Sequence, residues 1–115
     1  MNALEKVIAR LSATTGVHVS SDVPAERPDA FVTVERGGGG VTAYDDRPSL
    51  TVQVWCRDRL AVEDLVERVE DSLLSMRDEV DGVQSVSVTT RSYFPEQGEA
   101  LWPRYVLDVD AYCAR

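Results

Sequence analysis

The sequence is poor in the side chains that most often carry out catalysis or bind metal ions. It has one histidine and two cysteines, and no C-x-x-C, H-E-x-x-H, Cys-His or Ser-His-Asp arrangement can be built from their spacing. Because His18 has no partner at a recognisable spacing, we expect it to lie at the surface or at a strand edge. The sequence therefore predicts that the protein is not an enzyme and uses no cofactor.

Long apolar runs and an export signal are also missing. No apolar run approaches the roughly 18 residues that cross a bilayer. The start, MNALEKVIARL, is amphipathic and is not a basic end followed by an apolar block. We therefore expect no membrane association and a cytosolic start, with Cys56 and Cys113 reduced. Both cysteines end predicted strands, where a sheet could make them neighbours.

Positive charge is scarce, with 12 Lys and Arg against 20 Asp and Glu and a net charge of −8 at pH 7. Affinity for nucleic acid comes from clustered Lys and Arg that release counterions from phosphate. The composition therefore argues against a protein that grips DNA. The acidic excess either keeps the protein soluble or repels DNA that passes nearby. The carboxylate pairs Asp45–Asp46 and Asp108–Asp110 are of a kind common on exposed strands, so we expect no metal site.

The clearest regular pattern is an amphipathic helix from Leu60 to Arg77. Asp58 is placed to cap it, and the turn dipeptide Asp81–Gly82 follows its end. Leu74 falls about 100° from the centre of the apolar stripe, so it is either a flank of the core or an apolar contact for another subunit. The stripe itself consists of Val62, Leu65, Val66, Val69, Leu73 and Met76.

A second helix and five strands complete the expected fold. The helix covers about Ala3 to Thr14, with Asn2 as its cap and Gly16 as its stop. Alternation with period two predicts the strands. They cover Val17–Val19, Ala30–Arg36, Ser49–Cys56, Val83–Phe94 and a stretch from Trp102 to Tyr112.

Two of these strands allow their faces to be assigned. Val32 and Val34 are the expected inward pair of the second strand. In the fourth strand, one face is expected to carry Val86, Val88, Thr90, Ser92 and Phe94. The whole pattern predicts one α+β domain over residues 1–115, with a mainly antiparallel or mixed sheet of four to five strands and two helices packed on one face.

A run of four glycines, Gly37–Gly40, directly follows the strand that ends at Arg36. It makes an eleven-residue connection from Gly37 to Arg47, between two strands that we expect to pair as a long hairpin. A phosphate-binding loop would end on Lys-Ser or Lys-Thr and open a helix, whereas this run leads into a strand. We therefore expect a mobile arm that becomes ordered against a partner.

The succession of elements resembles the tail terminator (tail completion) proteins of long-tailed bacteriophages, including lambda-like siphophages. The resemblance rests on AFVTVERGGGG, on DDRPSLTVQVWC and on RDRLAVEDLVERVEDSLL, and it covers nearly the whole chain. The family pattern usually has two or three glycines where this chain has four.

The resemblance implies a structural virion protein. Six copies would form a ring on the last ring of tail-tube subunits, halt tube growth and dock to the head-side connector. The implied partners are other copies of the chain, the tail tube protein and the connector, while DNA passes through without specific binding. The implied location is the head–tail junction of the virion, and the host cytoplasm during assembly.

Two hypotheses about surfaces follow. The glycine-rich connection, from Arg36 to Arg47, reaches the adjacent subunit or the tube ring, and part of the acidic excess lines the channel of the ring. The candidate interface residues come from this connection, from two tryptophans and from one helical leucine. They are Arg36, Gly37, Gly38, Gly39, Gly40, Tyr44, Asp45, Asp46, Arg47, Trp55, Leu74 and Trp102.

Three other functions stay open from the sequence. The chain has the size of other phage head–tail joining proteins, and its element order also suits a small-molecule-binding regulatory module of ferredoxin-like shape. A small hydrolase has His18 as its only support. Trp55, Tyr93 and Trp102 lack interleaved basic residues, so we expect core or subunit-interface anchors and no platform for stacking bases.

Overall fold

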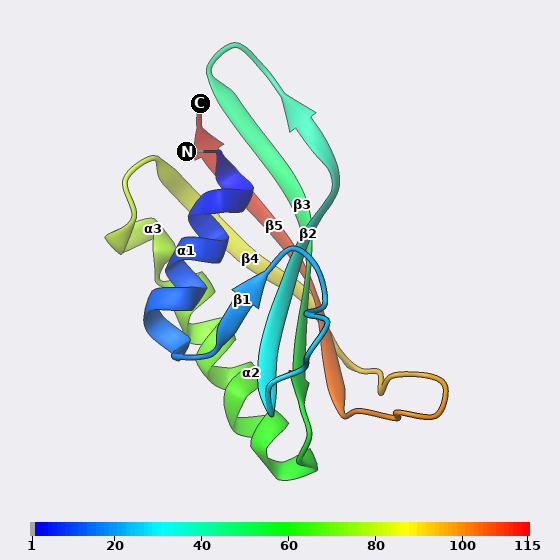
Figure 1. Cartoon of the computed structure of the whole chain (residues 1–115). Helices are drawn as coiled ribbons and strands as arrows, with labels where there is room; N and C mark the ends of the chain where they lie inside the picture. The colour runs from blue at the N-terminus through cyan, green and yellow to red at the C-terminus, as the bar shows by residue number, and fades with distance from the viewer. Residues whose placement is uncertain (1) are drawn as a thin grey trace.

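A computed structural model describes residues 2–115 and shows a two-layer α+β fold, with helices on one face of a five-stranded mixed sheet (Figure 1). This confirms the fold class predicted from the sequence. Within residues 2–115 no helix is long and apolar enough to span a membrane. The elements are α1 (Ala3–Thr15), β1 (His18–Ser20), β2 (Ala30–Val41), β3 (Asp45–Cys56), α2 (Arg59–Leu74), α3 (Met76–Glu79), β4 (Val83–Tyr93) and β5 (Arg104–Ala114).

The strands lie in the order β1-β2-β3-β5-β4. The short β1 is parallel to β2, and every other pair of neighbours is antiparallel. Because β3 and β4 are both antiparallel to β5, they run in the same direction with β5 between them. The connection through α2 and α3 therefore crosses over β5, on the face that α1 also covers (Figure 1).

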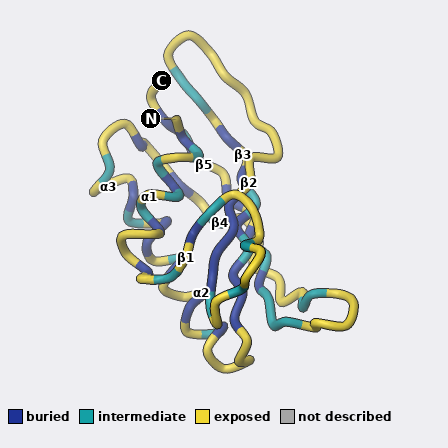
Figure 2. Tube along the Cα trace, viewed as in Figure 1, coloured by how far each residue is buried: buried dark blue, intermediate teal, exposed yellow. Residues whose placement is uncertain are grey.

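The core lies between this helical layer and the sheet, where Figure 2 shows the buried segments together. All six residues of the predicted helical stripe are at most 1% exposed, which confirms that this stripe is core. Val32 and Val34, the predicted inward pair of β2, are fully buried in the same cluster. From the other elements, the core takes Val7, Leu11, Leu50, Val52, Val54, Leu107 and Val109.

The predicted helix caps are present. The Asn2 side chain accepts a hydrogen bond from the Glu5 N–H at 2.9 Å, and the Asp58 carboxylate accepts one from the Ala61 N–H at 2.9 Å. Gly16 ends α1 with a φ of +73°, in the left-handed region that glycine adopts readily.

The helix predicted from Leu60 to Arg77 is wrong at its C-terminal end. It stops at Leu74, and the short α3 follows after Ser75. The Ser75 hydroxyl donates to the carbonyl of Ser72 at 3.2 Å, and the Arg10 guanidinium donates to the Ser75 hydroxyl at 2.8 Å. Because these side-chain bonds compete with the regular helical pattern, they break the helix here.

The eleven-residue connection predicted from Gly37 to Arg47 is also wrong. β2 continues to Val41 and β3 begins at Asp45, so only residues 42–44 form the turn. Gly38 lies opposite Ser49 and Gly40 opposite Arg47, after a β-bulge between Arg36 and Gly38. Glycines have no side chain with which to display strand alternation, so the partner strand, and not the local sequence, defines this segment as a strand.

The hairpin formed by residues 36–47 is ordered by the chain itself, contrary to the expectation of an arm that orders only against a partner. β5 accompanies β3 to its first residue, with Ala114 opposite Asp45. Beyond β5, the Arg115 N–H donates to the Tyr44 carbonyl at 2.8 Å and its guanidinium to the Thr42 carbonyl at 3.1 Å. The C-terminus therefore supports the turn of the hairpin.

The faces of β4 differ from the prediction beyond Val88. A register shift between Val88 and Thr90 marks a β-bulge, and past it Tyr93 lies opposite Tyr105 on the helix-covered face. An extra residue exchanges the two faces of a strand. Ser92 consequently lies on the open face and does not share the face of Val88.

The two cysteines are buried and unbonded, as predicted, but they are not neighbours. Cys56 ends β3 opposite Ala30, whereas Cys113 lies opposite Asp46 at the other end of that strand. Burial raises the pKa of the Cys56 thiol to about 11, and burial also raises the pKa of Cys113. Both thiols are therefore protonated and poorly nucleophilic near neutral pH.

Candidate assembly surfaces

The predicted interface residues separate into three places. Most belong to the hairpin of residues 36–47, at one end of a molecule that is 45 Å long. Trp55 and Trp102 lie on the sheet face that the helices leave open, while Leu74 lies on α2. The structure therefore does not bring all the predicted residues into one surface.

The charged residues of the hairpin bind one another and the neighbouring strand. The Arg36 guanidinium donates to the Asp46 carboxylate at 2.9 Å. The Asp45 carboxylate accepts a hydrogen bond from the Tyr112 hydroxyl at 2.8 Å, and the Arg47 guanidinium stands 4.5 Å from the centre of the Tyr112 ring. These four charges therefore stiffen the hairpin within the subunit.

What the hairpin offers to a partner is apolar side chains and backbone. Tyr44 at the turn is 82% exposed, and Val41 beside it is 51% exposed. The outer edge of β2 is covered by β1 only from Phe31 to Thr33. Within residues 2–115, the edge from Val34 to Val41, which includes all four glycines, has no strand beside it.

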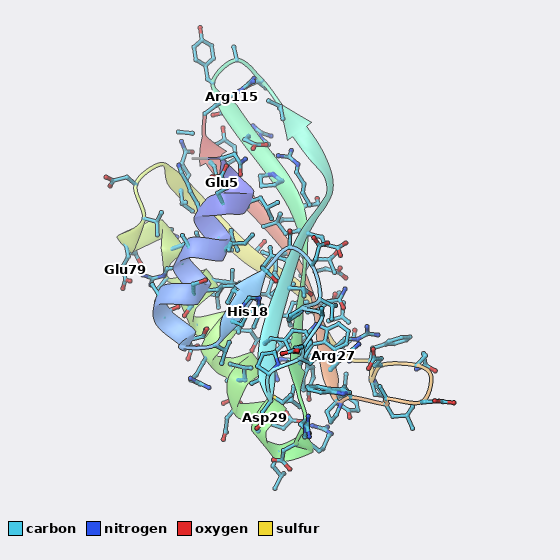
Figure 3. All side chains as sticks on the ribbon, viewed as in Figure 1. Glu5, His18, Arg27, Asp29, Glu79 and Arg115 are labelled. Atoms are coloured by element: carbon cyan, nitrogen blue, oxygen red, sulfur yellow. The ribbon has the colours of Figure 1, made fainter. Side chains whose placement is uncertain are left out.

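A cluster of aromatic rings and arginines lies at the other end of the sheet, on its open face. Phe31 stacks on Trp55 with ring centres 5.2 Å apart, and Trp102 lies 5.7 Å from Phe31. The Arg27 guanidinium is 5.3 Å from the centre of each tryptophan ring, and Arg104 is 4.9 Å from Trp55. Figure 3 shows Arg27 on the side of the sheet away from α1.

Arg27 also joins two loops that are far apart in the sequence. Its guanidinium donates to both carboxylate oxygens of Glu96, at 2.8 and 2.7 Å. These hydrogen bonds are the main cause that lowers the pKa of the Glu96 carboxyl, and the positive charge of Arg27 lowers it further. The pair therefore holds the loop between β4 and β5 against the loop between β1 and β2.

This cluster was only partly foreseeable. The sequence suggested core or interface anchors, and Trp55, which is 4% exposed beneath the arginines, lies in the core position. Phe31 was detectable as the residue that points opposite to Val32 in its strand. Arg27 and Glu96 lie in aperiodic segments next to prolines, where no pattern indicates a contact.

Exposed apolar side chains also occur outside the hairpin. In the loop between β4 and β5, Phe94 is 52% exposed and Leu101 is 63% exposed. Leu101 has a φ of +48°, which is uncommon for a residue other than glycine. Leu74 is 47% exposed on α2, so it is at most a flank of the core and remains open to a partner.

The middle of the open face is polar and acidic. Glu35, Asp108 and Asp110 are exposed there. The Thr90 hydroxyl donates to Asp108 at 2.6 Å, and the Ser49 hydroxyl donates to Asp110 at 3.0 Å. Between the aromatic cluster and the hairpin, this face therefore presents carboxylates among serine and threonine side chains.

The described residues do not assemble catalytic chemistry. Among residues 2–115, no group of three His, Cys, Asp or Glu side chains is placed to hold a metal ion. His18 is exposed on β1, as predicted. A hollow of about 300 Å³ between α1 and the hairpin is lined by Lys6, Asp46 and Cys113 among others, and its thiol has the raised pKa described above.

Comparison with known proteins identifies the fold. No model of a known protein family matches the sequence, and no curated protein matches it. Among solved structures, the chain shares its fold with a chain of the virion of a native gene transfer agent (GTA) particle. The two are 15% identical, each is covered over 100% of its length, and the TM-score is 0.70.

Proposed function

We propose that the protein is a structural component of a phage-like virion and, more specifically, a tail terminator. The observation that carries this proposal is the match over both full lengths to a chain of a gene transfer agent virion. The sequence resemblance to tail terminator proteins points in the same direction and was drawn from different features, namely the glycine run and the strand and helix that follow it.

The proposed assembly is a ring of six copies. The ring caps the tail tube, stops its growth and joins it to the head-side connector, so the partners are the same chain, the tube protein and the connector. It belongs to the head–tail junction of the virion and to the host cytoplasm while assembly proceeds. The protein acts by binding these partners, without catalysis and without a cofactor.

The exposed surfaces suit such a part. Tyr44 and Val41 project at one end of the molecule, and Phe94 and Leu101 project from the β4–β5 loop near the aromatic cluster at the other end (Figure 1). A subunit between two neighbours and two stacked partners needs several distinct contacts of this kind. The acidic open face is the surface past which DNA would move without adhering, because like charges repel.

Electron microscopy of the purified full-length chain tests the ring directly. Six-fold rings are the expected particles, and added tail tubes should carry one ring at an end. Monomers only, at concentrations up to the highest that stay soluble and also with tubes present, would contradict the proposal. Rings that bind the connector and ignore tubes would instead indicate another head–tail joining protein.

The hairpin can be tested by deleting Gly38–Tyr44. The remaining chain should stay folded, because the core contains none of these residues, but it should no longer form rings or cap tubes. Circular dichroism and thermal unfolding check the fold, and a sizing column follows assembly. Normal ring formation by the deletion variant would show that the hairpin makes no essential contact.

A further inference from the structure

The sheet has two edges that lack a neighbouring strand over most of their length. β4 is bordered by β5 on one side only. On the opposite side of the sheet, β1 covers β2 only from Phe31 to Thr33, and the rest of that edge carries the glycine run. Unpaired N–H and C=O groups of an edge strand are a ready template for another strand.

Neither edge has the features that usually keep edge strands apart. Natural edges carry charged side chains or proline, or are very short. The first eight residues of β4, VQSVSVTT, contain no charge and no proline, and the same holds for the segment GGGGV that ends β2. Glycines also leave room for a second backbone to approach closely.

The two edges have opposite polarity. β2, β3, β5 and β4 are successively antiparallel, so β4 runs antiparallel to β2. A second copy placed beside the first in the same orientation therefore brings its β2 antiparallel to the first copy's β4. The contact joins two different surfaces, which is the kind that closes into a ring by rotation.

The registers of the two edges also match. Gly39 lies opposite Pro48, and Val86 lies opposite Ala111. Because Ser49 pairs with Asp110, Pro48 falls at the level of Ala111. Gly39 and Val86 therefore stand in one row across the sheet, and no shift along the strands is needed to continue it.

The backbone groups in this row point outward at both edges. Alternate residues of an antiparallel strand direct their N–H and C=O to opposite sides. The Thr42 N–H bonds to the Asp45 carbonyl across the hairpin, so Gly39, three residues earlier, turns its groups away from β3. The Ala114 N–H bonds to the Gly82 carbonyl, and counting through the bulge at Ser85 turns Val86 away from β5.

The structure also limits the extent of the pairing. The neighbour's β1 occupies the level of Thr33, which corresponds to Ser92 on β4. β4 must therefore turn away before this point, and its β-bulge lies between Val88 and Thr90. The pairing can extend from Val83 to about Val88.

We propose that adjacent subunits join by antiparallel pairing of β4 of one copy with the outer edge of β2 of the next, with Val86 opposite Gly39. The inference rests on the proposed ring and assigns its subunit contact. The sheet then continues from subunit to subunit, and all open faces lie on the same side of it.

Engineered disulfides test this register in the full-length protein. The pairing places Gly38 of one copy beside Ser87 of the next in a non-hydrogen-bonded pair, where Cα atoms lie about 4.5 Å apart, within disulfide range. A Cβ atom at Gly38 meets nothing within 4 Å, and Ser87 is exposed. On oxidation, G38C/S87C should give a ladder of covalent oligomers up to hexamers on a denaturing gel, and the ladder should disappear on reduction.

Matched variants control for random collision and for the buried native cysteines. G38C and S87C alone should give no ladder beyond a dimer. G38C/S92C places the second cysteine on the same strand and face, but at the level of the neighbour's β1, so it should not produce the ladder. An equal ladder from G38C/S92C would overturn the proposed register.

The outcomes separate this inference from the proposed function. Six-fold rings that form without the G38C/S87C ladder would overturn the strand pairing and leave the terminator proposal standing. A ladder that closes at a number other than six would support the pairing and contradict the hexamer. If neither rings nor a ladder form, both proposals fail.

Discussion

Gly39 lies opposite Pro48 in the hairpin with a φ of +102°, a backbone conformation that glycine adopts far more readily than other residues. A Cβ atom on Gly39 would collide with the backbone of Arg47 and Pro48. Gly40, the next residue, has neither constraint, because its φ is not positive and nothing lies within 4 Å of its Cβ position. The two glycines therefore provide a matched test of how the hairpin is held.

We expect G39A to lower the free energy of unfolding by about 1–3 kcal/mol, which is the usual cost of strained backbone. G40A should change it by less than about 1 kcal/mol in either direction, because alanine fits without strain. Urea unfolding followed by circular dichroism measures both values. Equal losses in the two variants would contradict the conformation described for Gly39.

The glycine run also shows where sequence reasoning reached its limit. Alternation of apolar and polar side chains predicted β3 and the first half of β2, since both bury one face. The segment after Arg36 has no side chains to alternate, so it was read as a loop, although pairing with Arg47 and Ser49 makes it a strand. Long-range pairing, which local pattern does not contain, decided its structure.

The helical stripe was predictable because its pattern and its burial have the same cause. Helical spacing places Leu65 and Val69 on one face, and the sheet covers that face. The break at Ser75 was not predictable, because it depends on Arg10, which is 65 residues away in the sequence. The same applies to the pairing of Arg27 with Glu96, across 69 residues.

The Arg27 contact should be measurable through the two tryptophans, since both lie beside it. R27A removes the hydrogen bonds to Glu96 and the cation over the rings. We expect a loss of about 1 kcal/mol of stability and a shift of tryptophan emission to longer wavelength as water reaches the rings. R57A is the control, because the Arg57 and Asp29 side chains are 70% and 88% exposed and their ion pair should contribute little. An unchanged emission spectrum in R27A would contradict this role.

Glu96 should make stability depend on pH in the acid range. The Arg27 hydrogen bonds lower its pKa in the folded state, so folding favours the carboxylate. Its contribution is fully present above the pKa of the unfolded chain, about 4.3, and is lost as the pH falls through the lower folded-state pKa. E96Q should therefore be less stable than the parent at pH 7 and lose less stability between pH 5 and pH 3. E99Q, an exposed change in the same loop, should follow the parent curve.

The core stripe of α2 should act on folding and not on assembly. Leu65 is 1% exposed, so L65A should lower the free energy of unfolding by about 2–5 kcal/mol. Leu60, on the same helix, is 76% exposed, and L60A should stay within about 0.5 kcal/mol of the parent. Urea unfolding gives both values. Folded L65A protein should still form rings at low temperature, and a variant that folds normally but fails to assemble would contradict this division.

The open face is the last surface whose role can be tested by charge. D108R/D110R changes the net charge of the chain from −8 to −4, because each substitution adds two positive units. D64R/D71R makes the same change on α2, which lies on the opposite side of the sheet. If the open face lines the channel, assembled D108R/D110R rings should retain linear duplex DNA at low salt, and the retention should fall as salt rises. The α2 variant should retain less at the same salt, because its new charges lie outside the channel. Equal retention by both variants, or retention by the α2 variant alone, would show that Asp108 and Asp110 do not face the passing DNA.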